Sequence, residues 1–262
     1  MINRRALAIA FTKPRPFRNG WPPRSTVPAA NSDGARSLLI ATRNAHKVQE
    51  IRAILSGPFR FLTLHDFPGA PVAVEDGDTF AANATRKAVE LARWLSQLSN
   101  LPSARQGLPK WVLADDSGLE VDALGGAPGV HSARFAALDL GKHNSSEAAR
   151  ENSPDSANNE KLLRLLAGVP REKRTARFRC ALALVEITPP AGIGDPQLFE
   201  GVCEGRIGFA PSGRGGFGYD PLFTPIGHDH SFAELGEESK NKLSHRAQAL
   251  AKLRDYLLRA PL

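Results

Sequence analysis

The chain has 262 residues, 42% hydrophobic and 23% charged, a composition typical of a folded protein with a sizeable core. It has no apolar run near the roughly 18 residues that a membrane-spanning helix needs, so we expect no membrane span. The net charge of +7 comes mainly from residues 1–36, which hold seven basic residues and one acid. The nearly neutral remainder lacks the electrostatic signature of a nucleic-acid binder.

Residues 1–36 are rich in Pro, Arg and small polar residues, a composition typical of disorder. The scarcity of acids is compatible with an organelle transit peptide, but an extension without function is the interpretation we favour. Cys180 and Cys203 form no CxxC motif and fit a reducing compartment, so we expect a cytoplasmic protein. Residues 37–262 are expected to form one domain.

Hydrophobic periodicity predicts strands and helices that alternate along this domain. In chain order they are a strand over residues 37–42, a helix over 44–55 capped by Asn44, a strand over 59–64, a helix over 79–94 capped by Thr79, strands over 110–117 and 119–124, a helix over 159–169, a strand over 175–187, a strand with a hairpin over 198–209, and a helix over 243–260 capped by Ser244. The Ser- and Asn-rich residues 137–159 predict a mobile loop with little of the core. This order indicates an α/β fold with a mixed sheet.

Two adjacent carboxylates, Asp115 and Asp116, end an apolar run that predicts a buried strand. Buried like charges repel each other and lose hydration unless a cation or a proton compensates for them. The pair therefore indicates a metal site or an acid–base site. Since successive side chains of a strand point to opposite faces, we expect one carboxylate in a cleft and the other to brace the strand or backbone.

Two segments suggest contacts with a ligand. In "TRNAHK" (residues 42–47), a strand end leads into a helix start, where backbone N–H groups and Lys47 can cradle a phosphate. Taken alone, this segment favours an ordinary capped helix with a solvated lysine. "GRGGFG" (residues 213–218) matches GxGxxG, but it leads to Pro221 instead of a helix start and so does not indicate a dinucleotide site. It predicts either a close backbone approach to a ligand, beside Phe217 and Tyr219, or a hairpin turn with core aromatics.

Charged residues near two other predicted helices are weaker candidates. His245 and Arg246 lie in the first turn of the last helix, where positive charge opposes the helix dipole, so a bound anion or nucleobase edge would explain them. A solvated surface is the alternative. Glu75 and Asp76 either favour a helix start through the dipole or supply a carboxylate to a hard cation. The "HDH" at residues 228–230 has no third ligand nearby and is interpreted as a loop.

Taken in order, the motifs closely resemble those of the inosine triphosphate pyrophosphatase family. The segments that carry the resemblance, over residues 38–258, are "TRNAHK", "FAANATRKA", "ADDSGLEVDALGGAPGVHSARF", "NNEKLL", "GGFGYDPLF" and "SHRAQAL". The resemblance implies an elongated, two-lobed α/β domain around a long mixed sheet, with the active-site cleft between the lobes. It also implies a homodimer and Mg²⁺-dependent hydrolysis of ITP, dITP and XTP to the monophosphate and pyrophosphate, which cleanses the nucleotide pool.

The resemblance also implies roles for matching residues. Asp116 is the expected proton acceptor and, with Glu75, the expected metal ligand, while Asn83 and Lys87 complete the metal and phosphate site. The residues expected to bind the substrate are Thr42, Arg43, Asn44, Ala45, His46, Lys47 and Ser117 at the triphosphate, and Phe217, Gly218, Tyr219, Asp220, Lys240, His245 and Arg246 around the nucleoside. The basic segment 1–36 and the long polar segment 137–159 depart from the family pattern without touching these motifs.

The chemistry expected of these residues follows from their types. Lys47 and Lys87 would neutralise charge that develops on the phosphates. Ser117 is interpreted as a ligand-binding hydroxyl, because no GxSxG motif surrounds it. Whether Asp116 deprotonates the attacking water or positions it through the metal stays open. Arg246 can donate to a purine O6 and N7, whereas adenine would present an N6 donor to it.

Two other functions are considered beside this one. A related pyrophosphatase that acts on modified pyrimidine or methylated nucleotides would share the fold and differ at Arg246 and Phe217. A non-enzymatic nucleotide- or RNA-binding protein would use the basic residues 1–36 and yield no Mg²⁺-dependent product. We favour the enzyme, because a protein that only binds has little need for carboxylates beside phosphates.

Overall fold

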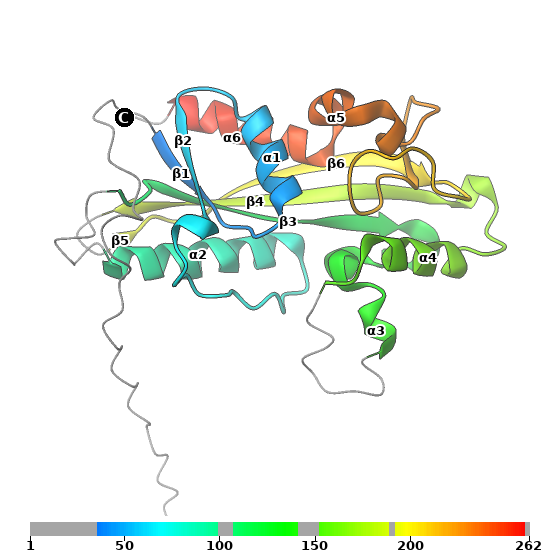
Figure 1. The fold of residues 1–262 in the computed structure, drawn as a ribbon, viewed down its shortest axis with the longest axis horizontal. Helices are drawn as coiled ribbons and strands as arrows, with labels where there is room; N and C mark the ends of the chain where they lie inside the picture. Colours follow the sequence, from blue (N-terminus) through cyan, green and yellow to red (C-terminus); the bar gives the residue numbers. More distant parts are fainter. Residues whose placement is uncertain (1–35, 99–106, 141–151, 189–191, 260–262) are drawn as a thin grey trace, which may run out of the picture.

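The computed structural model describes residues 36–98, 107–140, 152–188 and 192–259. They form a mixed seven-stranded sheet in the order β2-β1-β3-β4-β6-β7, with β5 paired to β4. Figure 1 shows α1, α5 and α6 above the long sheet and α2, α3 and α4 below it. The molecule is thus the elongated α/β domain that the sequence predicts. Within these ranges no helix combines the length and the apolar character needed to cross a membrane.

The first lobe is built from the amino-terminal elements. They are β1 (Arg36–Ile40), α1 (Ala45–Ile54), β2 (Phe59–Thr63) and α2 (Phe80–Leu98). Asn44 caps α1 by accepting a hydrogen bond from the Lys47 backbone N–H at 3.2 Å, and Thr79 accepts one from Ala82 at 3.1 Å. Both caps confirm the predicted helix starts. β1 pairs in parallel with β2 and β3, which places the carboxyl end of β1 beside the middle of β3.

Three long strands connect this lobe to the second one: β3 (Trp111–Val121), β4 (Thr175–Thr188) and β6 (Gln197–Ile207). β4 lies between the other two and is antiparallel to both. Their side chains alternate between two cores. Val112 and Ala114 pack with α2 on one face, while Trp111 and Leu113 pack with α1 and α6 on the other. A third core fills the far end of the sheet and includes Leu119, Phe178 and Phe223.

The second lobe surrounds the far ends of β3 and β4. It contains the 3₁₀ turn η4 (Gly129–Arg134), α3 (Ala137–Leu140), α4 (Asp155–Leu165) and β7 (Phe223–Pro225). Gly118 of β3 permits η4 to pack on the strand, because a Cβ there would lie 2.4 Å from Ser132 Oγ and 2.6 Å from the Gly129 carbonyl. Ser132 Oγ accepts a hydrogen bond from the Leu119 backbone N–H at 2.9 Å, which ties the turn to the strand.

The last two helices are α5 (Phe232–Leu243) and α6 (His245–Arg259), and β5 is the short strand Gly192–Ile193. Ser231 caps α5, and the Ser244 hydroxyl accepts from the Ala247 backbone N–H at 3.1 Å to cap α6. The start of α6 lies directly on β6. A Cβ at Gly201 would sit 2.0 Å from the His245 carbonyl oxygen, so glycine is required for this close approach.

Several predicted boundaries were wrong. The two strands expected over 110–117 and 119–124 are the single strand β3, because Gly118 keeps its pairing with Arg179 of β4. The expected hairpin at 198–209 is the single strand β6, which pairs with β4 and β7. The segment 137–159 contains α3 and the first turn of α4, with Asn158 and Asn159 buried, although residues 141–151 lie outside the described ranges. Lys240, expected before a helix, belongs to α5, which the sequence did not predict. The predictions for residues 1–35 also lie outside the described residues.

Replacing Gly201 with Ala should destabilise the protein by about 1–3 kcal/mol or more, because the new methyl group meets backbone instead of a side chain that can rotate away. Gly194→Ala is the matched control, since its Cβ would lie 3.6 Å from the nearest atom, an ordinary contact. Urea denaturation of both variants measures the difference. Equal stability of the two variants would contradict the packing of α6 on β6.

Candidate active site

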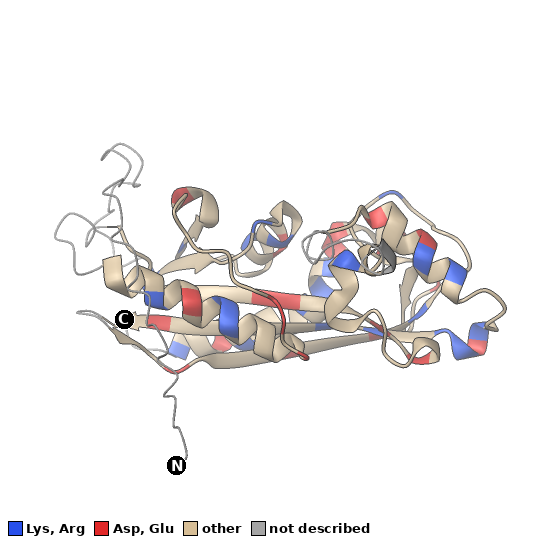
Figure 2. Cartoon of the chain, turned by 90° about the horizontal axis from the view of Figure 1, so that it is seen from below, with Lys and Arg blue, Asp and Glu red and all other residues tan. Residues whose placement is uncertain are grey.

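A cavity of about 330 Å³ lies between the two lobes at the middle of the sheet. The end of β1, the middle of β3, η4, the loop before β7 and the junction of α5 and α6 all line it. Figure 2 shows acidic residues on a central strand between the helices of the two lobes, and mixed charges along those helices. The site therefore lies at an interior position that both lobes complete.

The cavity opens on an edge of β3 that its neighbour leaves free. The last residue pair of β1 and β3 is Ile40 with Leu113, and Ala41 still donates to the Leu113 carbonyl at 2.7 Å. Beyond that point the chain turns away into α1. The next residues of β3, Asp115 and Asp116, point to opposite faces, yet both line the cavity. The prediction that only one of the two carboxylates reaches the cleft was wrong.

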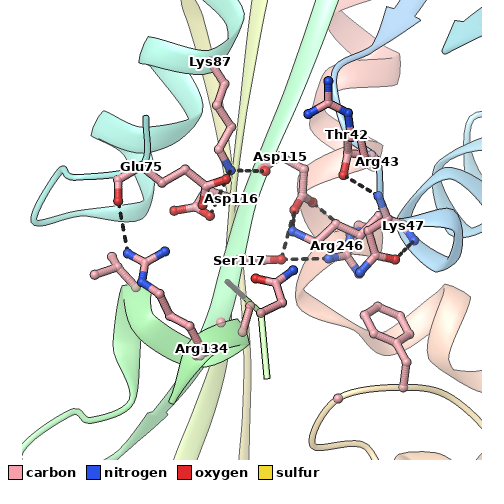
Figure 3. Close-up of a pocket in the computed structure, with 18 of the residues that line it drawn as sticks. Thr42, Arg43, Lys47, Glu75, Lys87, Asp115, Asp116, Ser117, Arg134 and Arg246 are labelled. Carbon is pink, nitrogen blue, oxygen red and sulfur yellow. Dashed lines mark hydrogen bonds and ion pairs between the residues drawn. The ribbon is translucent and has the colours of Figure 1, made fainter. Parts of the chain in front are cut away.

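Asp115 lies among cations on the α6 side of β3 (Figure 3). Its carboxylate pairs with Lys47, accepts from Arg246 Nε at 2.9 Å and from the Ser117 hydroxyl at 3.0 Å. Burial alone would raise the pKa of Asp115, but Arg246 and Lys47 outweigh it and hold that pKa well below its usual range. Asp115 therefore stays ionised and anchors two basic residues of the site. Neither the resemblance nor the spacing assigned it this role.

Arg246 extends this arrangement into a chain of buried charges. Its guanidinium pairs with Glu50 of α1 and donates to the Ser117 hydroxyl at 2.8 Å, in addition to its contact with Asp115. Glu50 also lies 2.8 Å from Lys240 Nζ. Burial would raise the pKa of Glu50, but Arg246 and Lys240 lower it below its usual value.

The chain of buried charges ends beside the aromatic ring of Phe217. Lys240 Nζ donates to Asp220 Oδ2 at 2.6 Å and lies 4.2 Å from the centre of the Phe217 ring. The His46 ring stacks on Phe217 with centroids 5.1 Å apart and planes inclined by 12°. This end of the cavity therefore combines an aromatic ring, a second ring stacked on it and a cation over it, a set of groups that can also interact with a planar heterocycle.

His245 adds a buried imidazole at the same end. Its ring stacks on Phe178 at 4.8 Å, and its Nδ1 has no hydrogen-bond partner in the described structure. Burial, reinforced by Arg246 and Lys240, lowers the pKa of His245 well below its usual value. The imidazole is therefore neutral at physiological pH.

Asp116 lies on the other side of β3, toward α2 (Figure 3). It accepts from Lys87 Nζ at 3.3 Å and from Asn83 Nδ2 at 3.1 Å. Lys87 Nζ also lies 3.0 Å from Glu75 Oε1, so two carboxylates share one ammonium group. Burial raises the pKa of Asp116, and the nearby Glu75 adds to this, while Lys87 acts against it. This carboxylate is consequently more basic than an exposed aspartate.

The loop that carries Glu75 is held from both lobes. Asn83 accepts from the Gly77 backbone N–H at 2.8 Å and donates to the Gly77 carbonyl at 3.3 Å. Arg134 of η4 donates to the Glu75 carbonyl at 3.0 Å. These contacts place a partly exposed Glu75 beside the buried Asp116.

The donor set of Asp116 and Glu75 fits a magnesium ion. Mg²⁺ in nucleotide sites uses one or two carboxylates and completes its shell with water and phosphate oxygens. Both carboxylates here already approach one cation, Lys87, from the same side of the cavity. No group of three or more His, Cys, Asp or Glu side chains with metal-site geometry occurs among the described residues, so a metal would depend on the ligand for further oxygen donors.

Most of the residues predicted to bind the substrate lie around this cavity. Those that line it are Thr42, Arg43, Asn44, Lys47, Glu75, Asp116, Ser117, Phe217, Gly218, Tyr219, Asp220, Lys240, His245 and Arg246. Ala45 does not line the cavity, and His46 reaches it through its stacking on Phe217. Sequence reasoning missed Glu50 and Arg134, and it singled out Asp115 without predicting its cationic partners.

Comparison with known proteins shows the family of this chain. Residues 38–256 match the Ham1 family. A protein of Geobacter sulfurreducens named dITP/XTP pyrophosphatase is 48% identical over 84% of this chain and 96% of its own length. One of the same name from Shouchella clausii is 43% identical, with the same two coverages. This chain belongs to the Ham1 family.

Solved structures of the Ham1 family confirm the fold. A HAM1 protein from Coxiella burnetii aligns with a TM-score of 0.66 and 34% identity, over 86% of this chain and 99% of that one. A nucleoside-triphosphatase / dITP/XTP pyrophosphatase from Mycobacterium abscessus aligns with a TM-score of 0.59 and 35% identity, over 83% of this chain and 98% of that one. The family resemblance that the sequence motifs indicate is thereby confirmed.

Replacing Asp115 with Asn should destabilise this Ham1-family protein by about 3–5 kcal/mol at neutral pH, because Lys47 and Arg246 lose their buried counter-charge. The folded-state pKa of Asp115 is depressed, so its contribution is complete above the unfolded-state pKa and is lost as pH falls through the folded value. The gap between wild type and variant should therefore be constant above about pH 4 and shrink below it.

Denaturant unfolding of wild type and variant between acid and neutral pH measures this gap. Asp122→Asn is the matched control, because Asp122 also pairs with an arginine, Arg177, but on the surface. Its loss should change the stability by less than about 1 kcal/mol. A gap for Asp115→Asn that widens toward acid pH would contradict the assignment of Asp115 as an ionised anchor.

Proposed function

We propose that this protein hydrolyses the noncanonical purine nucleoside triphosphates ITP, dITP and XTP to the nucleoside monophosphate and pyrophosphate. One observation carries the proposal: a single cavity has two carboxylates and a lysine at one end and an aromatic ring surrounded by cationic donors at the other. The names of the Ham1-family relatives support the same chemistry. The chain is a nucleoside-triphosphate pyrophosphatase, and its expected role is to cleanse the nucleotide pool.

The triphosphate is expected to bind between the start of α1 and Lys87. The first turn of a helix leaves backbone N–H groups without intrahelical partners, and its dipole favours an anion. Thr42, Asn44 and Lys47 line this part of the cavity. Lys87 approaches from the opposite side, where burial would lower its pKa, but Asp116 and Glu75 raise it above the usual value. Both lysines would neutralise charge on the phosphates during transfer.

Asp116 is the group best placed to accept a proton from the attacking water. Its pKa is raised, which favours general-base action, and Asn83 holds its carboxylate by a hydrogen bond. Asp116 and Glu75 would also hold a Mg²⁺ ion, which neutralises phosphate charge and orients the phosphate oxygens when bound. Hydrolysis of a phosphoanhydride by water needs no covalent nucleophile. Ser117, which bonds to Asp115 and Arg246, acts in this proposal as a binding and positioning hydroxyl.

The purine is expected to stack on Phe217. Lys240 and Arg246, which lie over the Phe217 ring, would then be close to the base, with the neutral His245 nearby. Arg246 uses one N–H each on Nε, Nη1 and Nη2 for Asp115, Glu50 and Ser117, and the remaining N–H groups of Nη1 and Nη2 can donate to a purine O6 and N7. Adenine presents a donor at that edge, so ATP should be a poor substrate. A homodimer and a cytoplasmic location, which the resemblance and the cysteine content suggest, complete the proposal.

Pyrophosphate release from ITP, dITP, XTP, GTP, ATP and dUTP, with Mg²⁺ or with EDTA, tests the proposed function directly. The first three should turn over fast with Mg²⁺ and not with EDTA. Asp116→Asn should lower kcat by about 10²–10⁴-fold, because the base and a metal ligand are lost together. Glu120→Gln is the matched control, since Glu120 lies on the same strand but pairs with Arg177 and Arg179 outside the cavity.

Each result of this panel has a distinct meaning. Turnover of dUTP in place of the purines would point to a pyrimidine pyrophosphatase with the same fold. A folded wild type that releases pyrophosphate from none of these nucleotides would contradict the proposal that the protein is this enzyme.

Replacing Arg246 with Ala should narrow the difference in kcat/KM between ITP and ATP, because the donor that distinguishes O6 from an N6 amino group is removed. The variant also removes one of the two cationic partners of Asp115 and one of the two of Glu50, so less of it will be folded. The ratio of the two kcat/KM values is independent of the amount of active enzyme and is therefore the quantity to measure. An unchanged ratio would assign base selection to other residues.

A further inference from the structure

The loop that carries Phe217 is held by helix α4, at the far side of the cavity from α1. The Gly218 backbone N–H donates to Asp155 Oδ2 at 2.6 Å, and the Gly218 carbonyl accepts from Asn159 Nδ2 at 3.0 Å. Asp155 and Asn159 are one helical turn apart, so they lie on the same face of α4. Both polar backbone groups of the residue after Phe217 are thus bound by a single helix.

Burial of the Asn159 side-chain amide costs free energy. The side chain is 8% exposed, and its Oδ1 has no hydrogen-bond partner in the described structure. A buried amide that is only half satisfied is unfavourable compared with an apolar side chain of similar size. The hydrogen bond from Nδ2 to Gly218 is the polar contact that offsets this cost.

The two residues that follow Gly218 are bound by other elements. The Tyr219 hydroxyl donates to the Ser132 carbonyl of η4 at 2.8 Å, and Asp220 pairs with Lys240 of α5. The Tyr219 contact with η4 and the Asp220 contact with Lys240 are made by side chains, whereas Gly218 is bound to α4 through its own backbone groups. Gly218 has a φ of +63°, which glycine permits but does not enforce. The contacts from α4 restrict this otherwise adaptable residue.

Helix α4 is itself fixed to the second lobe. Asn158 Oδ1 accepts from the Ala136 backbone N–H at 2.8 Å, and Lys161 Nζ donates to the Phe135 carbonyl at 2.6 Å. The residues of these two backbone contacts follow η4 directly in the sequence. The turn η4 itself packs on β3 at Gly118. Gly218 is therefore held, through α4 and η4, at a fixed position relative to the strand that carries Asp115 and Asp116.

We propose that Asp155 and Asn159 are positioning residues that hold the Phe217 ring in the place where it stacks on the purine. This inference rests on the proposed function and deepens it. When a binding-competent arrangement is populated only part of the time, the apparent affinity falls by that fraction. Loss of the α4 contacts should therefore weaken binding of the base and leave binding of the triphosphate unchanged.

The test compares a substrate that has a base with a probe that has none. In Asn159→Ala and Asp155→Ala, KM for dITP should rise about five- to tenfold, as expected for the loss of one hydrogen bond. The value of kcat should stay within about twofold, since no group at the phosphates changes. Inhibition by inorganic tripolyphosphate should be unaltered in both variants.

Asp155→Asn is the matched control, because its side-chain carbonyl can still accept from the Gly218 N–H. It should keep the KM of the wild type. Asn159→Asp, which preserves the shape of the side chain and removes the donor, should raise KM as Asn159→Ala does. Thermal unfolding of all variants establishes that each is folded at the assay temperature.

Two outcomes would overturn the inference while leaving the proposed function intact. One is an unchanged KM for dITP in Asn159→Asp and Asp155→Ala. The other is a parallel loss of tripolyphosphate inhibition, which would show a general disturbance of the site. A wild type that does not hydrolyse dITP would be detected before any variant is measured, and it would overturn the proposed function together with this inference.

Discussion

A chain of buried, alternating charges is the interaction on which the site depends. Lys47, Asp115, Arg246, Glu50, Lys240 and Asp220 follow one another through direct contacts. Three cations and three carboxylates compensate one another, so the desolvation of each is offset by at least one oppositely charged partner. The chain joins α1, β3, α5, α6 and the loop before β7. A change in any of these elements would leave an uncompensated charge inside the protein, which is a strong restriction on their relative positions.

The early end of β1 makes this arrangement possible. Because pairing with β3 stops at Leu113, the following residues of β3 lie at a free edge, and side chains from both faces of the strand reach the same cavity. One face then holds the charge chain, with Asp115, and the other holds Asp116 with Lys87 and Glu75. Two carboxylates that are neighbours in sequence thus have opposite environments. Strong cationic partners lower the pKa of the first, and burial raises the pKa of the second.

Close approaches of backbone to backbone position the elements around this edge. Gly201 brings the start of α6, and with it His245 and Arg246, onto β6. Gly118 brings η4 onto β3, and η4 in turn holds the loop of Glu75 through Arg134. The geometry of the site is therefore partly determined by glycines, which contribute no side chain to it. Because these glycines have no side chain, the elements of the two lobes can approach closely enough to share one cavity.

Local patterns in the sequence were sufficient for the alternation of strands and helices, for the caps at Asn44, Thr79 and Ser244, and, through the order of the motifs, for the family. These features depend on neighbouring residues, whose spacing can be read directly. The segment 137–159 was misjudged because its Asn and Ser content is typical of a loop, whereas Asn158 satisfies its buried amide on the backbone of Ala133 and Ala136.

Only the tertiary structure decided which charges meet. Arg246 and Asp115 are 131 residues apart, and Glu50 and Arg246 are 196 apart, so no local spacing links them. The roles of Asp115 and Glu50 follow from burial and from partners that the fold brings together. The sequence by itself determined most of the elements, the family and most of the residues around the cavity. The tertiary structure decided the partner of each charge, because desolvation and Coulomb energy depend on distances in space and not along the chain.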